Sequence, residues 1–394
     1  LMTRMKEAIA FGIYHQDNRP KRVAARIHQD ILDLYSVASM GLFDHLDIHP
    51  SLFENNHLND FISLGKEKTN AVRKIISTID IHRFTHFKAH QVNLAIPIKI
   101  GDYTDFYSSE QHAYNAGVMF RDPDHALLPN WKHLPVAYHG RSSSIFVSGQ
   151  NFHRPKGQIN HSDTSLPVFS PTRRLDMELE MAAVIGKANS IGHSIPIDDA
   201  ESYVFGLCLL NDWSARDIQR WEYVPLGPFL SKNFFTSISP WIIPIEELES
   251  FRIPAPQQIP DVLPYLQEKD RRNFDITLEV YLQTKNNDIL KITTSNFKYM
   301  YWTVAQQIAH HTVNGCNLSV GDLLGSGTIS GPDPGSYGSF LEITWGGKKP
   351  IHLPDGSSRT FLEDGDTIII KGYAQNSTTR VDFGELRTTI LPSI

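Results

Sequence analysis

The chain has 394 residues, of which 41% are hydrophobic and 20% are charged, and its formal net charge is −6 at pH 7. A negative net charge argues against a broad phosphate-binding surface, so we expect no nucleic-acid partner, and no apolar run is long enough to cross a bilayer. The length exceeds the comfortable size of one hydrophobic core, so we expect a water-soluble protein of two domains.

The cysteines and the N-terminal residues favour a reducing cytoplasm. Cys208 and Cys316 are the only cysteines, and they form neither a CxxC pair nor the even-numbered framework of a disulfide-rich secreted domain. Arg4 and Lys6 precede a short apolar run over residues 8–14, but no small-residue cleavage site follows it. We therefore expect no signal peptide and a cytoplasmic location.

The first part of the chain reads as a small module without catalytic residues. Residues 22–34 are typical of two short strands around a polar turn at 28–30, and residues 58–79 have helix-like apolar spacing. The stretch 92–100 contains a proline and leads into a segment crowded with Tyr, Asp, Ser and His. We place a domain boundary near residue 97, which separates residues 1–97 from residues 98–394.

Beyond residue 97 short apolar or alternating runs recur between turns rich in Gly and Pro. The period is mostly two, which predicts strands and a mainly β second domain, a β-rich α+β architecture with few helices. The best helix covers Tyr301–His311 and is stopped by Asn314-Gly315. The clearest predicted strands are 274–282, 322–324, 340–345 and 367–371.

The segment MELEMAAVI, residues 177–185, contains two closely spaced carboxylates. As a strand it places Glu178 and Glu180 on one face, because side chains two residues apart point the same way. Glu, Leu, Met and Ala favour a helix, but the segment is short and ends at Gly186. Two neighbouring carboxylates repel unless a cation or a shared proton relieves them, although an exposed polar strand face explains the pair as well.

Two further carboxylates make a metal site the sharper interpretation. Asp105 lies in DYTDFYSSEQH, and Asp212 follows the apolar run YVFGLCLLN, which is typical of a buried strand with polar residues at its tip. If Asp105, Glu178, Glu180 and Asp212 meet in space, they form an oxygen-rich cage suited to Ca²⁺ or Mg²⁺, whereas zinc usually prefers His or Cys.

His112 is a candidate general base beside this cage. Ser108 and Gln111 fit a capping box that opens a helix, which would place His112 on the first helical turn near Asp105. The ordinary pKa of histidine lies near neutrality and suits proton transfer. A surface role is the alternative for most histidines, and His310-His311 fit the C-terminus of a helix for reasons of its dipole alone.

The segment 211–241 is dense in polar and aromatic residues. Arg216, Gln219 and Tyr223 share one face if the segment is helical, which an ordinary amphipathic surface helix explains equally well. The ammonium of Lys232 and the hydroxyl of Thr236 follow, and they are suited to a developing oxyanion or to a second cation.

Residues 325–345 are a glycine-rich turn that leads to a predicted strand carrying Glu342. The turn lacks the Gly-Lys-Ser/Thr ending of a phosphate loop and does not fit a dinucleotide fingerprint. Neither an HExxH motif nor a GxSxG elbow is present, which lowers the odds of a zinc peptidase or a serine hydrolase.

These segments together resemble the fumarylacetoacetase family. The resemblance covers nearly all of residues 101–345 and is weak before them. Its motifs, in chain order, are GDYTDFYSS with QHA, ALLPNW with HLPV and YHGRSSS, RRLDMELEMA, NDWSARDIQRWEYVPLGPFLSKNF with TSISPW, SNFKYMYWT, HHTVNGCNL and GDLLGSGTISG.

The resemblance implies a fold, a reaction and an assembly. The expected fold is a mixed β-sandwich roll for the catalytic domain, with a small SH3-like β-barrel domain before it, in a homodimer. The expected reaction is hydrolysis of the carbon–carbon bond of 4-fumarylacetoacetate to fumarate and acetoacetate, the last step of tyrosine and phenylalanine degradation. In that reaction a metal-chelated diketone with carboxylates is attacked by water, which a His–Glu dyad activates.

The resemblance also assigns roles to residues. Asp105, Glu178, Glu180 and Asp212 would bind a catalytic Ca²⁺, and His112 with Glu342 would activate water. Asp212, Lys232 and Thr236 would form a second site, for Mg²⁺, and Arg216, Gln219 and Lys232 would face the oxyanion. The substrate-contacting residues would be Tyr107, Arg121, Tyr138, Gln219, Tyr223 and Thr328.

Two alternative functions follow from the same residues. The first is an acylpyruvate hydrolase, or a related decarboxylase or isomerase of the same superfamily, whose members often lack the N-terminal module. The second is a non-enzymatic ion-binding protein in which the carboxylates only stabilise the fold, but it gives His112, Glu342 and residues 211–236 no purpose.

Overall fold

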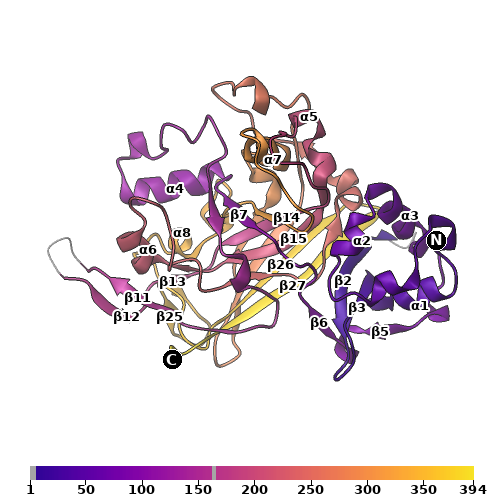
Figure 1. Cartoon of the computed structure of the whole chain (residues 1–394). Helices are drawn as coiled ribbons and strands as arrows, with labels where there is room; N and C mark the ends of the chain where they lie inside the picture. Colours follow the sequence, from indigo (N-terminus) through magenta and orange to yellow (C-terminus); the bar gives the residue numbers. More distant parts are fainter. Residues whose placement is uncertain (1–5, 162–165) are drawn as a thin grey trace.

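The computed structural model describes residues 6–161 and 166–394. Arg4, on which part of the signal-peptide argument depends, lies outside the described residues. The N-terminal elements pack at one end of a larger β-rich body, and the paired strands β11 (Lys156–Ile159) and β12 (Val168–Pro171) project from the opposite end (Figure 1). Within the described part of the chain, no helix is both long and apolar enough to cross a membrane.

The N-terminal part contains a five-stranded antiparallel sheet with the order β5-β4-β3-β2-β6. The two strands predicted over 22–34 are confirmed. The helix-like spacing over 58–79 does not correspond to a single helix, because Gly65, with a φ of 85°, separates two helices. The strands are β2 (Ala10–His15), β3 (Arg22–Ile27), β4 (Asp30–Asp33), β5 (His86–Lys88) and β6 (Asn93–Ala95), and the helices are α1 (Leu34–Ser39), α2 (Asn59–Ser63) and α3 (Lys66–Ile76).

A mixed eight-stranded sheet forms the centre of the molecule, with the order β8-β7-β23-β14-β15-β17-β9, and β18 pairs with β15. Two of its pairs, β7 with β23 and β17 with β9, are parallel. Its strands are β7 (Tyr103–Phe106), β8 (Ala137–Gly140), β9 (Ile145–Val147), β14 (Leu179–Ile185), β15 (Val204–Asp212), β17 (Thr236–Ile238), β18 (Ile243–Pro244) and β23 (Leu323–Gly325).

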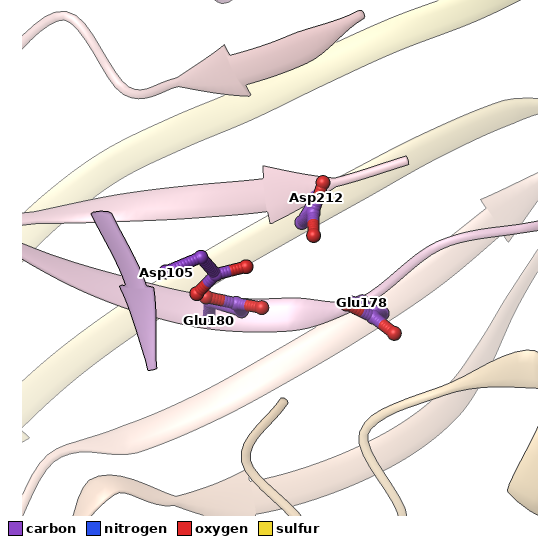
Figure 2. A group of neighbouring side chains, drawn as sticks. All are labelled: Asp105, Glu178, Glu180 and Asp212. Atoms are coloured by element: carbon purple, nitrogen blue, oxygen red, sulfur yellow. The ribbon is translucent and has the colours of Figure 1, made fainter. Parts of the chain in front are cut away.

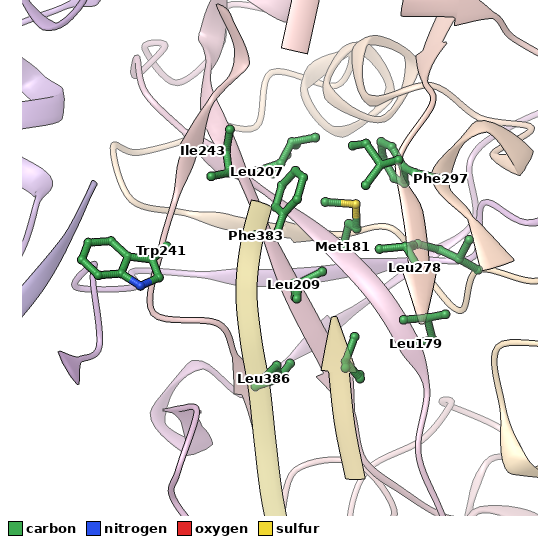
Figure 3. Close-up of a cluster of buried hydrophobic side chains, with 14 of the residues drawn as sticks. Leu179, Met181, Leu207, Leu209, Trp241, Ile243, Leu278, Phe297, Phe383 and Leu386 are labelled. Atoms are coloured by element: carbon green, nitrogen blue, oxygen red, sulfur yellow. The ribbon is translucent and has the colours of Figure 1, made fainter. Parts of the chain in front are cut away.

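A second, six-stranded sheet packs against the central one. Its order is β1-β27-β26-β21-β22, and β10 pairs with β27. The core between the sheets includes Met181, Leu209, Leu278 and Phe383, all buried (Figure 3). The strands are β1 (Lys6–Glu7), β10 (Phe152–His153), β21 (Thr277–Gln283), β22 (Ile289–Asn296), β26 (Thr367–Gln375) and β27 (Thr379–Leu391). The prediction of a mainly β fold with a small N-terminal unit is confirmed.

Alternation along the central strands separates two environments. In β14, and in β15 after its first residues, the odd-numbered apolar residues, such as Met181 and Leu209, join the core between the two sheets. The even-numbered residues, such as Val184 and Leu210, join a second core that is shared with the N-terminal elements. Because strand side chains alternate, the even-numbered positions near the other end of these strands share the face of this second core.

The predicted strand over 340–345 is wrong, because Phe340–Ile343 form the helix α8. Ser339 caps it by accepting from the backbone N–H of Glu342, so a short apolar run is helical here. The helix predicted over Tyr301–His311 is confirmed. Helix α7 begins only at Val304, because Thr303 is its N-cap and forms a capping box with Gln306. Helix α7 ends at Thr312, before Gly315 with a φ of 91°.

Three more α-helices and four short strand pairings complete the α-helices and strands of the described residues. The other helices are α4 (Glu110–Phe120), α5 (Ile197–Ala200) and α6 (Arg216–Glu222). The paired strands are β11 (Lys156–Ile159) with β12 (Val168–Pro171), β13 (Leu175–Asp176) with β16 (Ser214–Ala215), β19 (Arg252–Pro254) with β20 (Arg272–Phe274), and β24 (Ile351–His352) with β25 (Ser358–Arg359).

Candidate metal centre and reaction site

Four buried carboxylates meet on one face of the central sheet (Figure 2). Asp105 comes from β7, Glu180 from β14, and Asp212 from the tip of β15, while Glu178 directly precedes β14. One oxygen from each carboxylate lies within 4.8 Å of an oxygen from every other. The sequence analysis named these four residues as a set, and the fold brings them together.

Strand β23 separates β7 from β14 and leaves room for the cluster. Gly325 of β23 pairs with Asp105 on one side and with Ala182 on the other. A Cβ atom at Gly325 would lie 2.6 Å from Asp105 Oδ1 and 3.1 Å from Glu180 Oε2. The absent side chain is therefore what lets the carboxylates of β7 and β14 face each other.

On one side of the cluster, three carboxylate oxygens lack a positively charged partner. Asp105 Oδ1, Glu180 Oε1 and Asp212 Oδ1 are buried and have no hydrogen-bond partner. Burial, and then the neighbouring carboxylates, raise the pKa of Asp105 and of Glu180 well above the ordinary values. Oxygen atoms that lack a partner and repel one another fit a hard divalent cation such as Ca²⁺ or Mg²⁺.

The other half of the cluster is already neutralised by side chains. Arg216 Nη2 donates to Glu178 Oε1 at 2.7 Å, and Lys232 Nζ donates to Glu178 Oε2 and to Asp212 Oδ2, each at 2.7 Å. Burial opposes ionisation of Glu178, but Lys232 and Arg216 outweigh burial and lower its pKa. Tyr138 also donates from its hydroxyl to Asp212 Oδ2 at 2.8 Å.

His112 and Glu342 form a buried pair beside the cluster. His112 Nδ1 lies 2.7 Å from Glu342 Oε2, so the carboxylate accepts the Nδ1 proton and Nε2 is left as the basic nitrogen. Burial opposes ionisation of Glu342, but its contacts with His112, Ser339 and Asn115 lower its pKa. The hydroxyl of Ser330 donates to the same carboxylate at 2.9 Å.

His112 lies on the first turn of α4, as predicted, but the predicted cap is wrong. Ser109, not Ser108, caps the helix by accepting from the backbone N–H of His112 at 3.2 Å. Ser108 instead accepts from the Gln307 side chain of α7 at 2.8 Å. Glu342 reaches His112 from α8 and not from a strand, which places a helix on each side of the pair.

The other predicted residues fall into two groups. Gln219 accepts from Arg216 Nη1 at 3.1 Å, and Thr236 pairs with Asp212 between β17 and β15. Tyr107 lies edge-on to the His112 ring, with centroids 5.3 Å apart, and the buried Thr328 hydroxyl has no hydrogen-bond partner. The fold brings Gln219, Thr236 and Tyr107 to the cluster or to the His112–Glu342 pair. Thr328 follows Gly327, whose backbone N–H donates to Glu180 Oε2 at 3.0 Å.

Two predicted substrate contacts lie at the periphery. Arg121 is exposed and donates to the carbonyl of Ala126 at 2.7 Å, and its positive charge acts on Tyr107. Tyr223 follows the last residue of α6 and is 50% exposed. For both residues, the structure records no hydrogen bond to the four carboxylates among the described side chains.

Sequence reasoning missed two carboxylates that hold the site together. Asp176 lies two residues before Glu178, and the repeating spacing in DMELE was the signal that could have included it. Glu222 accepts from three consecutive backbone N–H groups, those of Phe229, Leu230 and Ser231, directly before Lys232. No pattern in the sequence connects Glu222 with that turn.

Comparison with known proteins covers nearly the whole chain. Residues 103–391 match a family model described as fumarylacetoacetate hydrolase C-terminal, and residues 7–97 match one described as fumarylacetoacetase N-terminal. Fumarylacetoacetase from Arabidopsis thaliana is 47% identical over 400 residues, which cover 98% of this chain and 95% of the relative. Fumarylacetoacetase from Homo sapiens is 45% identical, with 98% and 96% covered.

Solved structures share the fold at low sequence identity. A fumarylacetoacetate hydrolase from Exiguobacterium antarcticum has a TM-score of 0.58 at 17% identity, with 98% of this chain and 100% of the other covered. A maleylpyruvate hydrolase from Sphingobium in complex with manganese(II) and pyruvate has a TM-score of 0.54 at 13% identity, with the same shares covered. At such identities the likeness concerns the fold alone.

Proposed function

The chain belongs to the fumarylacetoacetase family and hydrolyses the carbon–carbon bond of fumarylacetoacetate, a reaction of tyrosine catabolism, and we propose that it does so with a divalent cation. Asp105, Glu178, Glu180 and Asp212 would hold that ion. The observation that carries the proposal is the buried, unpartnered oxygen on each of Asp105, Glu180 and Asp212. When bound, the ion supplies Lewis-acid polarisation of the diketone oxygens, worth several kcal/mol.

We propose Ca²⁺ for this cage, because an all-carboxylate donor set with adaptable geometry suits it. Asp212, Lys232 and Thr236 would form a second site, for Mg²⁺. Lys232 would contribute its carbonyl oxygen there, since its ammonium already donates to Glu178 and Asp212. The adjacent positions of Asp212 and Thr236 on paired strands support this second site.

His112 would act as the general base towards water. The Glu342 carboxylate accepts a hydrogen bond from the Nδ1–H group of His112, so the Nε2 lone pair is free to take a proton from the attacking water. Glu342 stays ionised because Asn115 and the hydroxyls of Ser330 and Ser339 also donate to it. A positioned general base of this kind contributes a factor of about 10² to 10⁴ in rate.

Arg216, Gln219 and Lys232 would face the alkoxide that forms when water attacks the carbonyl carbon. The Arg216 guanidinium has five N–H groups, and its three side-chain hydrogen bonds leave two free to donate. Because these donors are held in place before the reaction, each favours the developing charge, and loss of one such donor costs roughly 3 kcal/mol.

Tyr107, Tyr138 and Thr328 would contact the substrate next to the cluster, and Arg121, Gln219 and Tyr223 would complete the binding surface. The buried Thr328 hydroxyl supports this assignment, because it has no partner within the protein. Arg121, at the periphery, would bind a carboxylate of the substrate remote from the bond that breaks.

We also propose that the enzyme is a cytoplasmic homodimer, with a domain boundary near residue 97, between β6 and β7. Exposed apolar side chains on the β11–β12 hairpin and on α6 with the segment that follows it support self-association. The Trp221 indole donates to Gln158 at 3.2 Å, which holds these two segments side by side. The exposed apolar residues are Val168, Phe169, Trp221, Val224, Leu226 and Phe229.

The test follows the loss of ultraviolet absorbance of fumarylacetoacetate with the purified enzyme, before and after chelation and with Ca²⁺ or Mg²⁺ restored. We expect turnover to need the ion. We also expect His112→Ala to lose turnover by about 10² or more while it still binds Ca²⁺. Near-normal turnover of His112→Ala would reject the base assignment, and full turnover after verified metal removal would reject the cage.

A further inference from the structure

Asp176 is a fully buried carboxylate at a junction of three segments, and the reaction described above leaves it without a role. It ends β13, and it pairs with Ser214 of β16, which runs directly into α6. A few residues later, the backbone N–H of Leu179 donates to Gly338 at 2.8 Å, just before α8. Asp176 therefore lies where β13, α6 and α8 meet.

The two oxygens of Asp176 bind both neighbouring helices. Oδ2 accepts from Arg216 Nε at 2.8 Å and from the backbone N–H of Leu341 at 3.0 Å. Oδ1 accepts from the backbone N–H groups of Phe340 and Met177, each at 2.7 Å. One rigid group thus fixes the first residue of α6 relative to the first turn of α8.

Both helices carry groups of the proposed reaction. Arg216, held by Asp176 at Nε, uses Nη2 to bind Glu178 of the carboxylate cluster. Helix α8, held by Asp176 at its first two residues, carries Glu342, which binds His112. A continuous series of contacts therefore joins the cluster to the proposed base, and Asp176 is its central member.

We propose that Asp176 is a positioning residue that sets the placement of Arg216 relative to the His112–Glu342 pair. This inference rests on the roles proposed above for those three residues. Asp176 touches none of the reacting atoms; it acts through the helices that it joins. Misplacement of a reacting group by about 1 Å can cost about 10² in rate, so this placement affects turnover and not only stability.

The chain offers a matched control in Asp366, which is also fully buried. Its two oxygens accept from Arg359 Nε at 2.9 Å and Nη2 at 3.0 Å, and a backbone N–H, that of Glu363, donates to it at 2.8 Å. Asp366 directly precedes β26 in the other sheet. Asp176→Asn and Asp366→Asn therefore remove the same kind of buried ion pair, at the site and away from it.

The experiment compares thermal stability, kcat and KM for fumarylacetoacetate in the full-length wild type and both variants, with saturating Ca²⁺. We expect both variants to lose stability, but only Asp176→Asn to lose kcat, by about 10²-fold, with KM within about threefold of wild type. If Asp176→Asn does not fold, Asp176→Glu, which keeps the charge but shifts it by one methylene, is expected to show the same selective loss of kcat.

Two companion variants separate failure of this inference from failure of the proposed function. If Arg216→Gln and Glu342→Gln lose kcat while Asp176→Asn (or Asp176→Glu) keeps a kcat equal to that of Asp366→Asn, Asp176 is only structural and the inference is overturned. If Arg216→Gln and Glu342→Gln themselves keep wild-type kcat, the proposed roles are wrong, and the inference falls with them.

Discussion

The two halves of the carboxylate cluster differ in what balances their charge. Glu178 is held by Arg216 and Lys232, which lower its pKa, whereas Asp105 and Glu180 face each other without a cation and their pKa values are raised. Both halves are buried in one face of one sheet. The comparison teaches that the fold itself supplies positive charge to one half, and that the other half is where the proposed ion would balance the carboxylates.

The largest expected effect comes from filling the space between Asp105 and Glu180. Gly325→Ala places a methyl group 2.6 Å from Asp105 Oδ1, so the half of the cluster without cations can no longer close around an ion. We expect Ca²⁺ affinity, measured by calorimetry, to fall by about 10²-fold or more, and activity with it. Gly335→Ala, which meets nothing within 4 Å, is the control and should bind Ca²⁺ normally. Equal affinities would refute the packing argument.

Substitutions in the two halves should change the stability of the metal-free protein in opposite directions. Glu178→Gln removes the carboxylate that the buried Arg216 and Lys232 share. We therefore expect the free energy of unfolding to fall by about 3 kcal/mol. Glu180→Gln removes a repelling charge, so stability should rise or stay the same. Urea denaturation in chelator measures both, and a similar loss in both variants would show that the halves are equivalent.

The raised pKa values of Asp105 and Glu180 predict how pH affects the metal-free protein. A carboxyl group whose pKa is higher in the folded state contributes stability below its unfolded pKa and loses it as pH rises through the folded value. We therefore expect the melting temperature of the chelated protein to fall as pH rises from about pH 5 towards neutrality, and saturating Ca²⁺ to reduce this fall. A melting temperature that rises over this window would contradict the raised pKa values.

The smallest expected effect concerns Tyr138, an uncharged hydrogen-bond donor in the half of the cluster that Lys232 neutralises. Tyr138→Phe removes the hydroxyl that donates to Asp212 Oδ2, but Lys232 still donates to the same oxygen. We expect a loss of about 1 kcal/mol in unfolding free energy and a modest rise in KM, measured by denaturation and steady-state kinetics. An effect as large as that of Glu178→Gln would mean that Lys232 is not the main partner of Asp212.

Local patterns in the sequence predicted the parts of the site that depend on alternation along one strand. The spacing of Glu178 and Glu180, and the position of Asp212 after an apolar run, follow from the two-residue period of β14 and β15. The resemblance to known family motifs supplied the roles that spacing alone left open, including that of Glu342.

The remainder of the site depends on contacts between segments that are far apart in the sequence. Either Ser108 or Ser109 could cap α4, and the choice is made by Gln307, which binds Ser108 from α7. Helix α8 looks like a strand in the sequence, because its apolar residues are too few to show a helical period. Asp176 contacts the first turn of α8 although 164 residues separate them in the sequence, and a local pattern cannot predict such a contact.

The most direct test of the cluster as a metal centre is a Ca²⁺ titration of the chelated enzyme in which bound ion and turnover of fumarylacetoacetate are measured in the same samples. We predict that turnover is absent without the ion and recovers in proportion to occupancy of a site that Gly325→Ala weakens and Gly335→Ala leaves intact. Full turnover by enzyme shown by elemental analysis to be free of divalent metal would contradict the account.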